Sequence, residues 1–201
     1  MRATAPVILL SCVVFAFAQP GWAAPDAAGK ARREAAMSLQ IVSAAFLPHG
    51  VIPKRHTCDG EDHSPALAWN GAPEGTKSFA LVVDDPDAPD PAAPKTTWVH
   101  WVLYDIPANV TVLREGVAPK QLPNGTREGV NDWKQAGWRG PCPPIGRHRY
   151  FFKLYALDTV LPDLRKPAKA ALEKAMDGHV LAKAELVGTY QRLNHRPQPS
   201  N

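Results

Sequence analysis

The sequence is poor in three features that assign many chains to a class: charge of one sign, long hydrophobic runs and helical periodicity. Its 23 basic and 19 acidic residues leave a formal net charge of +4, too mild and too scattered to indicate a nucleic-acid-binding protein. After residue 23, no run comes near the ~20 consecutive apolar residues that a transmembrane helix requires. We therefore expect no nucleic-acid partner and no transmembrane segment.

Cysteine is also scarce, with three in 201 residues. Cys12 falls in the N-terminal segment that we expect to be removed, so Cys58 and Cys142 would remain in an oxidising compartment. An even count there favours a disulfide over the alternatives, a metal site or two buried free thiols. Neither cysteine has a second cysteine or a histidine at zinc-ligand spacing, apart from a loose pairing of Cys142 with His148.

The first 23 residues have the pattern of a secretory signal peptide. Arg2 precedes an apolar run over 7–18, and small residues around Ala23 provide a cleavage site. Pro20 and Gly21 break the run, which argues against a buried N-terminal helix. We expect the protein to be periplasmic or secreted, with four parts: a signal peptide over 1–23, a flexible lead-in over 24–36, one domain over 37–193 and a C-terminal tail over 194–201.

The 21 prolines concentrate in loops, which favours strands joined by ordered turns over long helices. One segment, 168–176, has apolar residues at helical spacing between Pro167 and Gly178, and should pack on a sheet. Residues 116–140 are predicted to form a long irregular loop. Strands are expected at 39–42, 66–69, 79–83 (ending at 84–86), 98–106, 149–157 and 184–190.

Two of these strands carry or follow one histidine each, next to a proline-rich turn. His100 follows the turn DPDAP at 85–89, and His148 follows GPCPPIG at 140–146. A lone histidine in a strand is more often a core residue than a functional one, but two in the same setting favour a site. The prolines limit the freedom of both turns, so less conformational entropy would be lost on binding.

Alternation of side chains along a strand predicts which groups accompany the histidines. His100 should share a face with Val102 and Tyr104, and the second histidine should share one with Tyr150. If these strand ends meet beside Asp85, they form a pocket with imidazole and phenol donors and a carboxylate. Such a pocket suits an anion of phosphate size, and a protonated histidine would bind that anion more strongly than a neutral one. We expect the affinity for phosphate to rise below the ordinary histidine pKa of ~6.5.

The two turns and the WVHW segment at 98–101 resemble signatures of the phosphatidylethanolamine-binding protein family, and most closely its bacterial, Raf-kinase-inhibitor-like branch. Further matches, between residues 39 and 192, are Cys58-Asp59-Gly60, Ser64–Trp69 and Gly188-Thr189-Tyr190. The resemblance implies a mainly β fold in which a large antiparallel sheet packs on a smaller sheet, with one or two short helices. It also implies a small ligand pocket formed by Asp85, Ala88, Pro89, Trp98, His100, Pro143, Pro144, His148 and Tyr150.

Two departures from the family pattern favour a phosphate-like anion or head group over a whole lipid. The loop between Pro89 and Trp98 lacks the tyrosine that eukaryotic members have near the ligand. The helix that closes the pocket in animal members has no counterpart after Tyr190.

With the signal-peptide pattern, the resemblance leads us to expect an exported, non-enzymatic binding or inhibitory protein without a cofactor. Animal members inhibit a kinase and a yeast member inhibits a serine carboxypeptidase, so the partner would be a kinase or, for an exported protein, rather a protease. The alternative is a hydrolase or a metal-dependent enzyme that uses His100 and His148 with Asp85. Against it, the sequence has no Gly-x-Ser-x-Gly elbow, no cysteine in an activating setting and no His-x-x-x-His pair.

Overall fold

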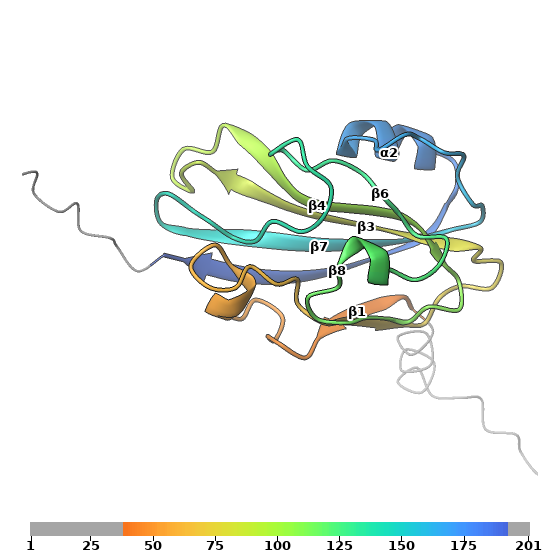
Figure 1. Cartoon of the computed structure of the whole chain (residues 1–201), viewed down its shortest axis with the longest axis horizontal. Helices are drawn as coiled ribbons and strands as arrows, with labels where there is room; N and C mark the ends of the chain where they lie inside the picture. Colours follow the sequence, from red (N-terminus) through yellow and green to blue (C-terminus); the bar gives the residue numbers. More distant parts are fainter. Residues whose placement is uncertain (1–37, 193–201) are drawn as a thin grey trace, which may run out of the picture.

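The computed structural model describes residues 38–192. The expected signal peptide over 1–23, the lead-in over 24–36 and the tail over 194–201 lie outside the described residues. Within 38–192 the fold is mainly β, with two antiparallel sheets and one α-helix, which confirms the predicted fold class (Figure 1).

The large sheet has five strands and the small sheet has three. In spatial order the large sheet consists of β6 (Arg127–Glu128), β4 (Thr96–Pro107), β3 (Ser78–Ala88), β7 (Arg147–Leu157) and β8 (Val180–Gln191). The small sheet consists of β1 (Gln40–Ser43), β2 (Leu67–Asn70) and β5 (Val112–Leu113). The described helices are α2 (Lys169–Met176) and the 3-10 turns η1 (Lys54–His56) and η2 (Pro119–Gln121).

The central strands β3 and β4 of the large sheet are buried on both faces, which explains the unbroken apolar run in β3. Phe79, Leu81 and Val83 point into the core between the two sheets, whereas Ala80 and Val82 point to the opposite face. Buried apolar side chains on both faces are typical of a central strand, and they remove the polar-apolar alternation from its sequence.

The helix α2 packs on the opposite face of the large sheet from the small sheet (Figure 1). Leu172 and Met176, two members of the predicted apolar stripe, are buried there, whereas Ala171 is exposed. No helix among the described residues is long and apolar enough to span a membrane.

A β-bulge in β4 changes the predicted facing of His100. Val83 pairs with Trp101 but Asp84 pairs with Val99, so His100 is an extra residue on its strand. Val99 therefore lies with Val102 and Tyr104 in the core under α2, and the prediction that His100 shares their face is wrong.

Two local predictions from the sequence also need correction. The strand predicted to end at 84–86 continues to Ala88, because β3 is still paired with β4 at Thr96. The segment 116–140, predicted as irregular loop, contains η2 and the short strand β6, which are too short to show a periodic pattern.

Candidate functional site

Three strand ends meet at one end of the large sheet and form a cavity there. Because β3 runs antiparallel to both β4 and β7, its last residues lie beside the first residues of the other two. Asp85 pairs with Trp98 across the β3–β4 ladder, and Asp84 pairs with Phe151 across the β3–β7 ladder. The cavity has a volume of about 250 Å³ and is lined by Asp85, Ala88, Pro89, Trp98, His100, Trp133, Cys142, Pro143, Pro144, His148 and Tyr150.

All nine residues expected at the pocket thus line one cavity. The ring of Tyr150 contacts both imidazole rings: its centroid lies 5.2 Å from that of His100 and 6.5 Å from that of His148. The structure adds Trp133 and Cys142 to the predicted set. Trp133 packs edge-on against Trp98, at 5.3 Å between ring centroids, but lies in a segment without periodicity, so only its aromatic character within a loop hinted at it.

A disulfide joins Cys58 to Cys142, with 5.4 Å between their Cα atoms, which confirms the predicted pairing. It ties the proline-rich loop that lines the cavity to the segment after η1. Two hydrogen bonds reinforce this link: the Cys58 amide donates to the Pro141 carbonyl at 3.1 Å, and the Gly140 amide donates to Asp62 Oδ1 at 2.7 Å. One wall of the cavity is therefore fixed both covalently and by hydrogen bonds.

Gly140 is required at this junction because the two loops touch. A Cβ atom at this position would collide with the backbone of His56 and Thr57 and with the carboxylate of Asp62. Burial raises the pKa of the Asp62 carboxyl, although the Gly140 amide opposes the rise.

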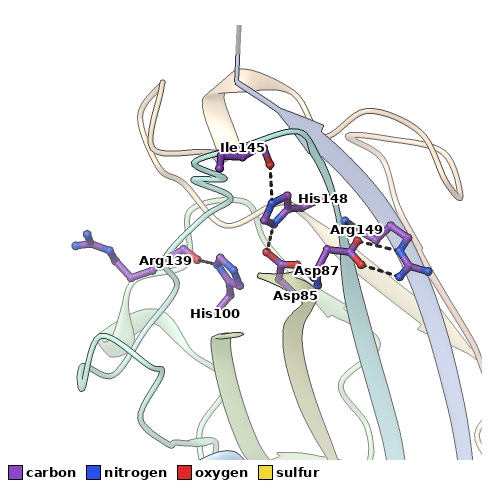
Figure 2. Close-up of polar contacts among 7 residues, drawn as sticks. All are labelled: Asp85, Asp87, His100, Arg139, Ile145, His148 and Arg149. Atoms are coloured by element: carbon purple, nitrogen blue, oxygen red, sulfur yellow. Dashed lines mark hydrogen bonds and ion pairs between the residues drawn. The ribbon is translucent and has the colours of Figure 1, made fainter. Parts of the chain in front are cut away.

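Asp85 and His148 form a buried pair on the cavity wall (Figure 2). His148 Nδ1 lies 2.7 Å from Asp85 Oδ2, and Nε2 donates to the Ile145 carbonyl at 2.9 Å. Asp85 Oδ1 accepts the amide proton of Asp87 at 2.8 Å, and burial raises the pKa of the Asp85 carboxyl. Both imidazole nitrogens of His148 are thus engaged within the protein, so its expected role as a hydrogen-bond donor to a ligand is not available in this arrangement.

The neighbouring carboxylate, Asp87, is directed at Arg149 instead of the cavity (Figure 2). Arg149 donates to it through Nε at 2.9 Å and Nη2 at 2.7 Å, and its amide donates at 2.9 Å. These hydrogen bonds hold the pKa of the Asp87 carboxyl below its usual range. The Asp87–Arg149 pair thus joins the end of β3, which carries Asp85, to the start of β7.

His100 is neutral at physiological pH. Its Nδ1 lies 2.6 Å from the Arg139 carbonyl, which can only accept, so Nδ1 carries the proton (Figure 2). Burial lowers the pKa of His100 to about 4. Protonation near pH 6.5 therefore does not give this histidine a charge for an anion, and its Nε2 carries a lone pair.

Two side chains that line the cavity carry a buried donor without a partner within 38–192: the hydroxyl of Tyr150 and the indole N–H of Trp98. Both atoms are buried, and neither has a hydrogen-bond partner among the described residues. Burial raises the pKa of Tyr150, which keeps its hydroxyl protonated and able to donate. The cavity lining, taken over the described part of the chain, includes no lysine or arginine.

No three His, Cys, Asp or Glu side chains within 38–192 are arranged as a metal site would require. What the arrangement offers a ligand is two neutral donors, an imidazole acceptor, a carboxylate that is already paired and an apolar rim of proline and tryptophan.

Comparisons with known proteins agree with this architecture. A model of the family described as phosphatidylethanolamine-binding protein matches residues 42–191. The chain is 49% identical over 155 residues to a UPF0098 protein of Methanothermobacter thermautotrophicus, covering 77% of this chain and 99% of that protein. It is 43% identical over 159 residues to a UPF0098 protein of Aquifex aeolicus, covering 77% and 89%.

Two crystal structures are similar to the fold over most of their length. One is a phosphatidylethanolamine-binding protein homologue from Chlamydia trachomatis, with a TM-score of 0.71, 39% identity and coverage of 77% of this chain and 98% of that chain. The other is E. coli YbcL, described as a member of the mammalian family, with a TM-score of 0.70, 34% identity and coverage of 77% and 99%.

Proposed function

The chain belongs to the phosphatidylethanolamine-binding protein family, and we propose that it is a non-enzymatic binding protein whose cavity takes a phosphate-like anion or a phospho head group. The observation that supports this most is the pair of buried donors without a protein partner, the Tyr150 hydroxyl and the Trp98 indole N–H. A buried donor left unsatisfied costs about 1–3 kcal/mol, and a ligand oxygen that accepts from it would remove that cost.

The size of the cavity favours a small group. Its volume of about 250 Å³ lies below the range of roughly 300–1,000 Å³ found for pockets that take drug-sized ligands. A phosphoryl group with a short substituent fits that space, whereas an acyl chain would have to lie outside it. The proline-rich wall tied down by the disulfide is stiff before the ligand arrives, which limits the entropy lost on binding.

Removal of the Tyr150 hydroxyl tests the proposal. In Tyr150→Phe we expect the affinity for inorganic phosphate to fall about tenfold by titration calorimetry, equivalent to ~1.4 kcal/mol for a lost hydrogen bond. The free energy of unfolding should be unchanged or higher, because the variant buries no orphan hydroxyl.

Tyr155→Phe is the matched control, since Tyr155 lies in the same strand but packs with the core under α2. Unchanged phosphate affinity in Tyr150→Phe would contradict the proposed donor, and failure of the wild type to bind either phosphate or phosphoethanolamine would contradict the function. Turnover of phosphoesters or peptides that is lost in His100→Ala would favour the enzyme alternative.

Export is the second part of the proposal. A disulfide fits an oxidising compartment, and the signal-peptide pattern over 1–23 predicts cleavage after Ala23. The intact mass of protein recovered from the periplasm or medium should correspond to a chain that begins at Ala24, and an uncleaved cytosolic chain would contradict export. Inhibition of a protease or kinase stays a prediction from the family resemblance.

A further inference from the structure

The cavity differs from most anion sites in its charge. Phosphate groups are commonly bound by Arg or Lys side chains, yet among the described residues none of these lines the cavity. Its one carboxyl group, Asp85, is paired with His148, so the two together contribute little net charge. A doubly charged anion would therefore enter a cavity whose lining over 38–192 includes no Arg or Lys side chain to balance its charge.

The polar atoms of the cavity include an acceptor as well as donors. His100 Nδ1 donates to the Arg139 carbonyl at 2.6 Å, so in the neutral ring of this cavity-lining residue Nε2 carries the lone pair. An unprotonated phosphoryl oxygen facing that lone pair would be repelled, whereas a P–OH group would donate to it. Tyr150 and Trp98 would meanwhile donate to the oxygens that carry no proton.

We propose that the cavity selects a phosphoryl group that still carries one proton: Tyr150 and Trp98 donate to its bare oxygens, and Nε2 of His100 accepts its P–OH. This inference rests on the proposed anion-binding function and names the class of ligand within it. The ligand is a phosphate monoester as its monoanion, or inorganic phosphate as its monoanion, dihydrogen phosphate. Phosphodiesters, such as the head group of an intact phospholipid, have no P–OH and are disfavoured.

Several titratable groups near His100 could add a pH dependence of their own to the measured affinity. Burial keeps its ring neutral, with a pKa of about 4, through the range in which a monoester loses its second proton. The titratable and charged groups that face it are Asp84 and Asp85 from β3, His148 and Tyr150 from β7, and Asp132 and Arg139 from the loop before β7. Sulfate controls for all of them, because its own charge is constant across the same pH range.

The experiment is titration calorimetry of the wild type with glycerol 3-phosphate, sulfate and dimethyl phosphate between pH 5 and pH 8. Sulfate has no proton to donate, and dimethyl phosphate is a monoanion without a P–OH. Glycerol 3-phosphate should bind at least tenfold more tightly than either at pH 5. Its affinity should fall about tenfold from pH 7 to pH 8, since the second proton of a phosphate monoester has a pKa of about 6. The affinity for sulfate should not follow this profile.

Substitution of the acceptor gives a second readout. In His100→Phe, which keeps a ring beside Tyr150, the preference for glycerol 3-phosphate over dimethyl phosphate should disappear while sulfate affinity stays as in the wild type. The matched control is His179→Phe, because His179 is exposed and pairs with Asp158, away from the cavity. The wild-type pH series needs no variant, so the test holds even if His100→Phe does not fold.

Four outcomes would overturn the inference. Three of them are sulfate binding as tightly as glycerol 3-phosphate, dimethyl phosphate binding as tightly as glycerol 3-phosphate, and an affinity for glycerol 3-phosphate that does not change between pH 6 and pH 8. Each would show that the cavity does not recognise the P–OH proton. So would tight, pH-independent binding of glycerophosphoethanolamine, because its ammonium group would then be the donor to His100. In all four cases the anion-binding function stands, whereas no binding of any probe contradicts that function itself.

Discussion

Two neighbouring residues of β3 place buried carboxylates on opposite faces of the large sheet. Asp85 faces the cavity and pairs with His148, whereas Asp84 faces α2. Asp84 lies 2.7 Å from the ammonium group of Lys153 and 2.6 Å from that of Lys169. Each carboxylate therefore has partners in its own layer, and one of these partners, Lys169, belongs to the helix that covers that layer.

The neutral, buried state of His100 should make the folded protein sensitive to mild acid. The unfolded chain takes up a proton here near pH 6.5, whereas the folded chain resists until about pH 4, so stability falls as pH falls between these values. The loss attributable to this group is ~3 kcal/mol, since one pKa unit corresponds to 1.36 kcal/mol. Urea unfolding from pH 7 to pH 4 should show a flatter profile for His100→Phe than for the wild type. Parallel profiles would show that the group does not titrate in this way.

The set of residues that line the cavity was predictable, but their hydrogen-bond roles were not. Proline-rich turns and stranded histidines are visible in the sequence, and they indicate the residues that line the cavity. The roles depend on the carbonyls of Arg139 and Ile145, which lie on irregular backbone. Each of those carbonyls accepts a hydrogen bond from one nitrogen of an imidazole ring, His100 Nδ1 or His148 Nε2. The pattern of side chains in the sequence does not indicate where these backbone carbonyls lie.

Among the elements, the long strands were predicted and their irregularities were not. An apolar run such as Phe79–Val83 indicates a buried strand whatever its neighbours are. The bulge at His100 arises from the pairing of β4 with β3, which no single strand reveals. It turns His100 and Trp101 toward the inter-sheet side, where Tyr150 and Trp138 contact them.

The helix α2 should contribute to stability without contributing to binding. Leu172 is fully buried against the sheet, so Leu172→Ala leaves a cavity and should cost ~2–5 kcal/mol of unfolding free energy. The affinity for phosphate should not change, because α2 covers the face of the sheet away from the pocket core. Lys174→Ala, an exposed change in the same helix, should shift stability by no more than ~0.5 kcal/mol. A loss of phosphate affinity in a folded Leu172→Ala protein would show that the two faces are coupled.

For the molecule as a whole, the disulfide links segments that are 84 residues apart in the chain. Asp59, next to Cys58, also accepts from the hydroxyl of Tyr190 at 2.8 Å and from Arg192 Nη2 at 2.9 Å. The segment after η1 is therefore joined to the loop before β7 on one side and to the end of β8 on the other. These links close the end of the large sheet at which the cavity lies.

Loss of the disulfide should weaken the fold and the cavity together. In the double variant Cys58→Ser/Cys142→Ser, unfolding free energy should fall by about 4 kcal/mol, the value that the chain-entropy model gives for so long a loop. Phosphate affinity should fall as well, because Cys142 lines the cavity. Urea unfolding and calorimetry of the variant, beside the wild type with and without reductant, measure both effects. A change below ~1 kcal/mol would show that the hydrogen bonds of the two loops suffice.

The back-to-back carboxylates of β3 also restrict how this gene can change length. Insertion of one codon between Val83 and Asp84 would turn both acids to the opposite faces, so that Asp84 would lose its lysines and Asp85 its histidine. Insertion of two codons would restore the facing. In descendants of this chain, we therefore expect insertions at this point to be tolerated in even steps.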